Sequence, residues 1–148
     1  MSAAKKKFTI YTDGGCDPNP GPGAWAALVL STGVEREMSG YEAATTNNRM
    51  ELTAAIQSLN SLPAGSEVEL FTDSQYVQKG IEEWLPNWLR RNWKSSSGKV
   101  ANRDLWELLV AAAARHTVRW HWVRGHAGNM FNQRVDRLVV KTRRSASG

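Results

Sequence analysis

Two aspartates in this chain each close a short run of apolar and β-favouring residues. Asp13 follows the run at residues 10–12, and Asp73 follows the run at residues 70–72. If the two runs are parallel neighbouring strands, both carboxylates lie at the carboxyl-terminal edge of one sheet, where α/β proteins commonly bind ligands. Two unpaired carboxylates 4 Å apart repel by ~4 kcal/mol at an effective dielectric constant of 20. The pattern therefore predicts cations between them, and our working hypothesis is a pair of magnesium ions.

The residues around Asp13 indicate an antiparallel meander. Alternating side chains at residues 8–13 are typical of a strand, and the glycine- and proline-rich stretch at 14–23 predicts an irregular loop. Two more strands are expected at 24–30 and 34–38, joined by a turn at 31–33.

A third acidic candidate, Glu51, lies in the first turns of a predicted helix. The polar residues 45–48 offer N-caps, apolar residues recur at helical spacing from Met50 to Leu59, and Pro63 follows the end. Two interpretations remain open for Glu51. It is either an ordinary surface glutamate favoured by the helix dipole, or it reaches the aspartate edge because the helix packs on the sheet.

The segment at 84–94 combines aromatic rings with positive charge. It follows a strand at 68–72 and a helix at 74–80, and it contains three tryptophans and three cations, which are Trp84, Trp88, Trp93, Arg90, Arg91 and Lys94. We interpret Trp84 as a core residue. For Trp88 and Trp93 two interpretations remain open. They are core residues, or, beside so many cations, they form with equal or better reason a surface that stacks on and pairs with nucleic acid.

The remaining chain predicts one more strand between two helices. Asn102 caps the first helix, His116 is expected to be solvated at its end, and residues 118–123 alternate as a strand in which His121 is structural. A glycine-flanked loop carries His126. Asn132 then begins a last helix that carries Asp136.

Size and composition bound the possibilities. A chain of 148 residues with no apolar run near the ~18 residues of a membrane span predicts one globular domain in the cytoplasm. The lysines at 5–7 precede no signal-peptide core, and the single cysteine, Cys16, excludes an intrachain disulfide.

Charge is distributed unevenly along the chain. Residues 1–87 contain 6 Lys/Arg and 11 Asp/Glu, whereas residues 88–148 contain 13 Lys/Arg and 3 Asp/Glu. This asymmetry fits either uneven surface patches or an acidic metal-binding half joined to a polyanion-binding half.

Several blocks of this sequence, in order and at matching spacing, resemble the type 1 ribonuclease H family. They are residues 11–14 with 19–21, 45–52, 72–76, the tryptophan- and arginine-containing segment, 102–106, 123–128, and Asn132 with Asp136. The resemblance covers the chain from about Lys7 to Asp136.

The resemblance implies an α/β, ribonuclease H-like fold, with a five-stranded mixed sheet in β-β-β-α-β-α-β-α order flanked by helices. It implies an endonuclease that hydrolyses the RNA strand of RNA–DNA hybrids and leaves 5′-phosphate and 3′-hydroxyl ends. Its acidic quartet would be Asp13, Glu51, Asp73 and Asp136, holding two Mg²⁺ ions, for which Mn²⁺ would substitute. In such sites the ions activate water and stabilise the leaving oxygen. His126 matches a loop histidine that relays protons or helps product leave.

The same resemblance assigns substrate contacts. Residues expected along the RNA strand are Cys16, Asn19, Asn47, Asn48 and Gln75. The segment at 84–94 would hold the DNA strand, and Thr46 and Asn102 would bind one DNA phosphate. Such contacts position a duplex without reading its bases.

Three departures from the family pattern stand out. Val140 occupies a position where an arginine is usual, so that Arg137 or Lys141 would have to substitute for it. Pro86 and Leu89 interrupt the basic segment, and residues 129–131 replace a more polar run after the histidine loop.

Two rival functions are a nuclease of the same fold acting on DNA, such as an integrase or resolvase core, and a non-catalytic hybrid-binding module. The loop at 124–128 and the tryptophan-rich segment oppose the first, and the four retained acids oppose the second. We expect residues 1–6 to form a basic extension, 7–141 a single domain, and 142–148 a basic, disordered tail. A monomer with no obligatory protein partner and no membrane contact is expected.

Overall fold

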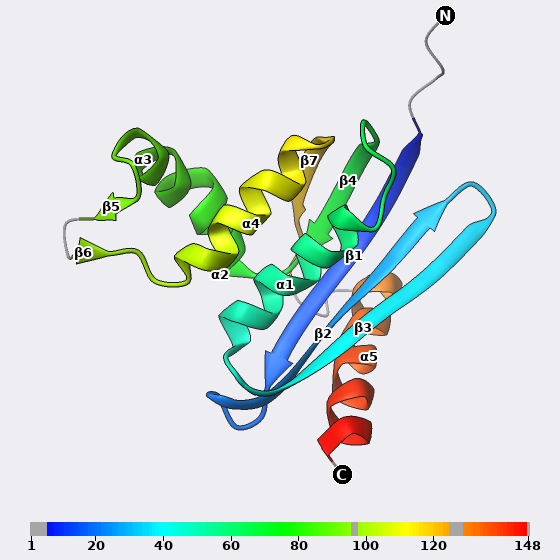
Figure 1. Cartoon of the computed structure of the whole chain (residues 1–148). Coiled ribbons are helices and arrows are strands. Elements are labelled where there is room, and N and C mark those ends of the chain that lie inside the picture. Colours follow the sequence, from blue (N-terminus) through cyan, green and yellow to red (C-terminus); the bar gives the residue numbers. More distant parts are fainter. Residues whose placement is uncertain (1–5, 96–97, 125–128, 148) are drawn as a thin grey trace, which may run out of the picture.

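The computed structural model describes residues 6–95, 98–124 and 129–147, and within them one five-stranded sheet forms the centre of the molecule (Figure 1). The strands lie in the order β3-β2-β1-β4-β7. Their bounds are Lys7–Cys16 for β1, Gly21–Ser31 for β2, Val34–Thr45 for β3, Glu67–Thr72 for β4 and Thr117–Trp122 for β7. β1, β2 and β3 are antiparallel neighbours, whereas β1, β4 and β7 run parallel. The predicted mixed sheet is confirmed.

Helices cover both faces of the sheet. Their bounds are Asn47–Asn60 for α1, Gln75–Lys79 for α2, Gly80–Trp84 for the π-helical turn η1, Leu85–Arg90 for α3, Arg103–Ala114 for α4 and Met130–Ser147 for α5. α1 and α4 lie on one face, and α5 crosses the other (Figure 1). A small hairpin of β5 (Lys94–Ser95) and β6 (Gly98–Lys99) projects beside α3. Among the described residues, no helix has the length and apolar character of a membrane span.

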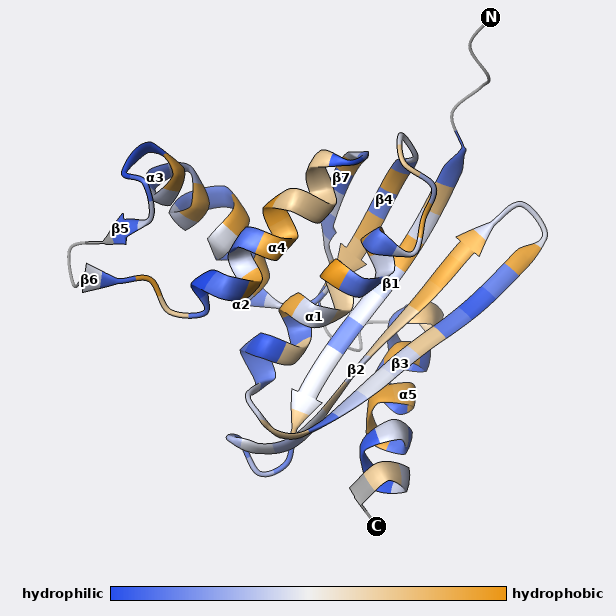
Figure 2. Ribbon diagram, viewed as in Figure 1, coloured by the Kyte–Doolittle hydropathy of each residue, from blue (hydrophilic) through white to orange (hydrophobic). Residues whose placement is uncertain are grey.

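Alternation along the strands separates two cores. Ile10 and Leu70 point toward α1 and α4, where the fully buried ring of Trp106 belongs to the main cluster. Tyr11 on the opposite side of β1 packs in a second cluster with Val135 of α5. Hydrophobic residues concentrate on β2, β4 and α4, and hydrophilic ones on β3 and around α3 (Figure 2). The sheet therefore fixes α1 and α5 on opposite sides of β1.

The expectation of an irregular loop over residues 14–23 is wrong at both ends. β1 continues to Cys16, which pairs with Gly23 of β2, so only residues 17–20 connect the strands. Glycine is needed in this stretch for close packing: a Cβ at Gly23 would lie 2.5 Å from the sulfur of Cys16.

The structure also differs from the prediction for the C-terminal residues. Residues 142–147 belong to α5 and are helical, whereas a disordered tail was predicted, and the helix begins at Met130, before Asn132. Between Met130 and Ser147 the chain contains no glycine or proline that would end a helix.

His116 is not simply solvated at a helix end. Its Nε2 lies 2.8 Å from the carbonyl oxygen of Leu59, and its Nδ1 accepts a hydrogen bond from the Ser66 backbone N–H at 3.3 Å. His121 lies 3.1 Å from Glu69 and stacks on Phe71, in keeping with its expected structural role. His116 therefore connects the end of α1 to the chain entering β4.

Candidate metal centre and nucleic-acid interface

Parallel pairing of β1 with β4 brings the first two aspartates to the same level of the sheet. Tyr11 pairs with Phe71, and continuing this register by two residues aligns Asp13 with Asp73. Asp13 is buried, at 8% exposure, and Asp73 directly follows the end of β4 and is half-buried. The predicted meeting of the two aspartates at one sheet edge is confirmed.

Glu51 reaches this edge because α1 lies against β1. The Gly14 backbone N–H donates to Glu51 Oε1 at 2.7 Å, and the Thr72 hydroxyl lies 3.5 Å from Oε2. A Cβ on Gly14 would lie 2.4 Å from the backbone carbon of Met50, so only glycine permits this approach. Of the two interpretations of Glu51, the surface glutamate is therefore wrong.

The carboxylates converge. One oxygen from each of Asp13, Glu51 and Asp73 lies within 4.8 Å of the other two. Asp136, from α5 on the opposite side of β1, comes within hydrogen-bonding reach of Asp13. Four acids separated by as many as 123 residues therefore meet around the end of β1.

Burial and mutual repulsion make this cluster costly to ionise. Burial, followed by the charge of Glu51 and its hydrogen bond, raises the pKa of Asp13 far above its ordinary value. Burial also raises the pKa of Glu51 to about 7, against the opposing hydrogen bonds from Asp13 and the Gly14 N–H. A bound divalent cation would reverse both shifts, because it stabilises the ionised form.

The donor set fits a hard divalent cation. Every candidate ligand atom is a carboxylate oxygen, the ligand type preferred by magnesium, calcium and manganese. The crowding of buried negative charge supplies the physical reason for a cation to bind here.

The predicted proton-relay residue, His126, lies outside the described residues. On its C-terminal side, Asn129 caps α5, because its Oδ1 accepts the Asn132 backbone N–H at 2.9 Å. That helix carries Asp136, so the start of α5 is fixed close to the carboxylate cluster.

Three of the residues expected along the RNA strand form one hydrogen-bonded group at the end of β1. The Cys16 N–H donates to Asn47 Oδ1 at 2.7 Å, and the Asn47 N–H donates to Asn19 Oδ1 at 3.1 Å. Asn48 and Gln75 are exposed at the starts of α1 and α2. Cys16, Asn19 and Asn47 are thus held together at the end of β1, the strand that carries Asp13.

The two residues expected at a DNA phosphate, Thr46 and Asn102, are linked through Arg49. Thr46 caps α1 by accepting the Arg49 backbone N–H at 3.2 Å, and the Arg49 guanidinium lies 3.3 Å from Asn102 Oδ1. Asp104 holds the guanidinium through contacts of 2.8 and 3.0 Å. Sequence reasoning did not single out Arg49, although it stands between Asn48 and Met50 in a recognised block.

Asn102 does not cap α4 with its side chain as predicted. Its backbone is left-handed, with φ of 59°, and its amide donates to the Tyr76 hydroxyl at 3.0 Å. The Trp106 indole N–H donates to the same hydroxyl at 3.0 Å. The conformation thus directs the Asn102 side chain toward α2 and Arg49.

The three tryptophans of the segment 84–94 form a series of ring contacts that continues to Trp106. Trp84 lies 5.9 Å from Trp88, and Trp88 lies 6.0 Å from Trp93, measured between ring centroids. Trp88 also packs edge-on against buried Trp106, at 5.6 Å. All three rings of the segment are half-buried, so Trp84 is not fully in the core and Trp88 and Trp93 are not free surface rings. Arg90, Arg91 and Lys94 are exposed beside them.

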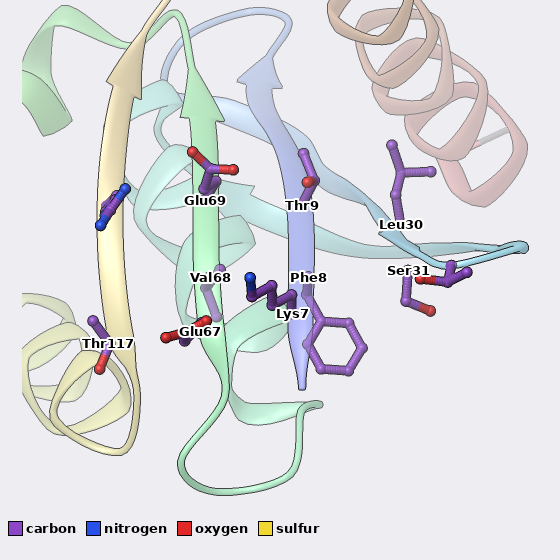
Figure 3. A pocket seen from close by; sticks show the side chains of 11 residues that line it. Lys7, Phe8, Thr9, Leu30, Ser31, Glu67, Val68, Glu69 and Thr117 are labelled. Atoms are coloured by element: carbon purple, nitrogen blue, oxygen red, sulfur yellow. The ribbon is translucent and has the colours of Figure 1, made fainter. Parts of the chain in front are cut away.

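A groove of about 600 Å³ lies at the opposite, amino-terminal end of the parallel strands (Figure 3). Its charged lining alternates in sign, with Lys7 and Arg119 beside Glu67 and Glu69. It contains none of the four clustered acids, so the candidate site is the carboxylate edge and not this groove.

Comparison with known proteins agrees with this geometry. The RNase H family model matches residues 5–144. The chain is 58% identical over 144 residues to a protein named ribonuclease H from Granulibacter bethesdensis, covering 97% of this chain and 96% of that one. The chain belongs to the ribonuclease H family. A ribonuclease H from Pseudomonas aeruginosa strain LESB58 is 55% identical over 136 residues, with 91% and 92% of the two chains covered.

Two solved ribonuclease H structures share the fold. LC9-RNase H1, described as a type 1 RNase H with the type 2 active-site motif, has a TM-score of 0.86 at 32% identity, covering 98% of this chain and 75% of that one. LC11-RNase H1, solved in complex with an RNA/DNA hybrid, has a TM-score of 0.73 at 22% identity, with 95% and 99% covered. The predicted ribonuclease H-like fold is thereby confirmed.

Proposed function

We propose that this protein is an endoribonuclease that hydrolyses the RNA strand of RNA–DNA hybrids, using two divalent cations held by Asp13, Glu51, Asp73 and Asp136. The observation that carries the proposal is the convergence of acidic oxygens within 4.8 Å at one sheet edge in a chain of the ribonuclease H family. When bound, the cations would supply a hydroxide nucleophile near neutral pH and neutralise charge on the leaving oxygen.

The chain's own residues then have three tasks. The four carboxylates hold the cations and come from three rigid elements and the end of β4, which preorganises the site. The Gly14 N–H orients the carboxylate of Glu51 through a 2.7 Å hydrogen bond. His126 would move a proton to the leaving group or assist product release.

Substrate contacts complete the proposal. The group of Cys16, Asn19 and Asn47, with Asn48 and Gln75, would contact the 2′-hydroxyl-bearing strand, which distinguishes RNA from DNA. Thr46, Asn102 and the exposed segment of Trp84, Trp88, Arg90, Arg91, Trp93 and Lys94 would hold the DNA strand. In support of this assignment, the cations of that segment are exposed beside half-buried rings.

Further proposals concern the setting of the reaction. Mg²⁺ would be the working ion with Mn²⁺ as a substitute, because both accept all-oxygen sites. Cleavage would leave 5′-phosphate and 3′-hydroxyl ends. We also propose a cytoplasmic monomer with no obligatory protein partner, in which one domain follows a basic extension at residues 1–6.

The test compares cleavage of an end-labelled RNA–DNA hybrid with that of duplex RNA and duplex DNA, with Mg²⁺ and with EDTA. We expect Mg²⁺-dependent cleavage of the RNA strand of the hybrid alone, and loss of turnover in Asp73→Asn. Glu67→Gln, at the opposite end of β4 from the carboxylate cluster, is the control and should cleave normally. Preference for duplex DNA would overturn the proposal in favour of a DNA nuclease, and hybrid binding without cleavage would favour a binding module.

A further inference from the structure

Four aromatic rings form a continuous series on the side of the sheet where α5 lies. The series runs from Phe131 in the first turn of α5, through Tyr11 of β1 and Phe71 of β4, to His121 of β7. The ring centroids are 5.2 Å apart for Phe131 and Tyr11, 4.7 Å for Tyr11 and Phe71, and 4.4 Å for Phe71 and His121. His121, at the end of the series, lies 3.1 Å from Glu69. Separations close to these are typical of favourable aromatic pairs.

The ring series lies one layer of side chains away from the carboxylates. Side chains two residues apart on a strand point to the same face, so Tyr11 shares a face with Asp13. Phe71 likewise stands two residues before Asp73, at the end of β4. Two residues of strand span about 6.6 Å. The rings therefore form the layer that supports the acids along β1 and β4.

Asp136 is the acid whose position depends on the packing of α5. Asp13 and Asp73 are aligned by the pairing of β1 with β4, and the Gly14 N–H holds Glu51. Asp136 instead comes from a helix that packs on the sheet through its side chains. Ionised carboxylates repel one another, and a divalent cation binds the ionised form. The cation affinity of the cluster therefore depends on contacts that keep α5 against β1.

Contacts along α5 occur in the same order as their partners along β1 and the residue that follows it. They are Phe131 with Tyr11, Asp136 with Asp13, and Arg143 with Asp17. From Phe131 to Asp136 the helix rises about 7.5 Å, at 1.5 Å per residue. This rise is close to the distance along the strand from Tyr11 to Asp13. The ring contact therefore sets α5 at the level that brings Asp136 to Asp13.

Other ion pairs of α5 do not fix this level as closely. Arg134 pairs with Glu35 and Glu37 of β3, which lies two strands away from β1. Arg143 lies 3.9 Å from Asp17, whose side chain is 77% exposed, and an exposed pair of this kind contributes little. The contact that attaches the first turn of α5 to β1 is thus the ring of Phe131 on Tyr11.

We propose that Phe131, through its contact with the Tyr11 ring, is a positioning residue that holds Asp136 in the cation-binding cluster, an inference that rests on the proposed function. Phe71 and His121 extend the support of Tyr11 to β7, the edge strand of the sheet. Val135, fully buried in the same cluster as Tyr11, holds the next turn of α5. Phe131 belongs to residues 129–131, where this chain departs from the family pattern, and this departure supplies the ring that contacts Tyr11.

The experiment measures Mn²⁺ binding to the metal-free protein by isothermal titration calorimetry, in wild type and in Phe131→Ala. Loss of a group that orients a metal ligand typically weakens metal binding 10–100-fold, and we expect about tenfold because Phe131 acts through a helix and not through a hydrogen bond. The Mg²⁺ concentration that gives half-maximal kcat should rise by a similar factor. KM for the hybrid at saturating Mg²⁺ should not change, because the ring contacts no substrate.

Three further variants separate positioning from general packing. Phe8→Ala is the matched control, because it removes a half-buried ring from the other end of β1 and from the cluster on the opposite face. This control should lose stability and keep its Mn²⁺ affinity. Phe131→Tyr retains the ring and should bind Mn²⁺ as wild type does. In a Tyr11→Leu background, Phe131→Ala should have little further effect, because two residues that act through one contact are not additive.

Wild-type Mn²⁺ affinity in Phe131→Ala, or an equal loss of affinity in Phe8→Ala, would overturn the positioning role and leave the endoribonuclease activity standing. Absence of hybrid cleavage by wild type with Mg²⁺ would instead refute the proposed function, so the two failures are distinguishable. Thermal melting in EDTA identifies any variant that is unfolded at the assay temperature. If Phe131→Ala is unfolded there, Phe131→Leu, which keeps an apolar side chain without a ring, is subject to the same test and the same refutation.

Discussion

Replacing Asp13 with asparagine should stabilise the metal-free protein while removing its activity. A carboxyl whose native pKa lies above its unfolded value binds more protons in the native state. The stability of the metal-free protein therefore decreases as pH rises from the unfolded value of 3.8 through neutral pH. Asparagine resembles the protonated carboxyl in shape but needs no proton, so its advantage over aspartate grows with pH.

The magnitude follows from the geometry of the cluster. Two carboxylates with oxygens within 4.8 Å of each other repel by at least about 3.5 kcal/mol at an effective dielectric constant of 20. The alternative to this repulsion is that Asp13 stays protonated at pH 7. Protonation then costs 1.36 kcal/mol for each pH unit above the unfolded pKa of 3.8, or about 4.4 kcal/mol in total. Since water and side-chain movement relieve part of the repulsion, we expect Asp13→Asn to raise the free energy of unfolding by about 2 kcal/mol at pH 7.

The assay is thermal and urea unfolding in EDTA at pH 4, 5.5, 7 and 8.5. A gain of about 2 kcal/mol corresponds to an increase in Tm of about 4–8 °C in a domain of this size, and the gain should disappear near pH 4. Glu82→Gln is the control, because Glu82 is exposed and lies outside the carboxylate cluster. With saturating Mg²⁺ the difference in Tm between Asp13→Asn and wild type should become smaller, since a bound ion stabilises wild type and not the variant.

Equal or lower stability of Asp13→Asn in EDTA at pH 7 would refute this reasoning, as would a gain that does not depend on pH. Either result would mean that the four carboxylates do not repel one another in the native state.

Three other changes test the scaffold and the substrate surface. Gly14→Ala should destabilise the protein by about 3 kcal/mol and weaken Mg²⁺ binding, because its Cβ would lie 2.4 Å from the α1 backbone. Denaturation and calorimetric titration measure the two effects. Gly15→Ala is the control, because the atom nearest to its Cβ would lie 3.8 Å away. Gly80→Ala should lower Tm strongly, because its Cβ would lie 2.0 Å from the Trp106 ring; a Tm equal to that of Lys79→Ala would contradict this packing. Replacing Arg90, Arg91 and Lys94 together with glutamine should weaken hybrid binding. The slope of log K against log[salt] should become less negative by about 2 to 3, and an unchanged slope would mean that these residues do not contact the hybrid.

The sheet edge was predictable because parallel strands place their ends together. The runs before Asp13 and Asp73 both consist of an aliphatic residue, an aromatic residue and threonine, so their alignment followed once both were interpreted as strands. Glu51 was ambiguous, because a first-turn glutamate looks the same whether its helix faces the sheet or the solvent. Gly14 resolves the ambiguity, and only in three dimensions is it visible that α1 lies against its Cα.

Other features depended on long-range contacts that local patterns do not encode. Glycines 14 and 23 indicated a loop, yet in the structure they serve close packing inside strands. Asn102 looked like a helix cap, but its left-handed backbone turns its amide toward Tyr76. The ion pairs of Arg134 with Glu35 and Glu37 could not be found from sequence, because α5 and β3 are far apart along the chain and meet only in the folded protein.

The proposed metal centre is tested most directly by anomalous diffraction from crystals grown with Mn²⁺ and a hybrid whose scissile linkage cannot be cleaved. We predict two anomalous peaks among the carboxylates of Asp13, Glu51, Asp73 and Asp136, with a phosphate of the RNA strand beside them. Crystals with bound hybrid but no peak at these four side chains, or with a peak only elsewhere, would contradict it.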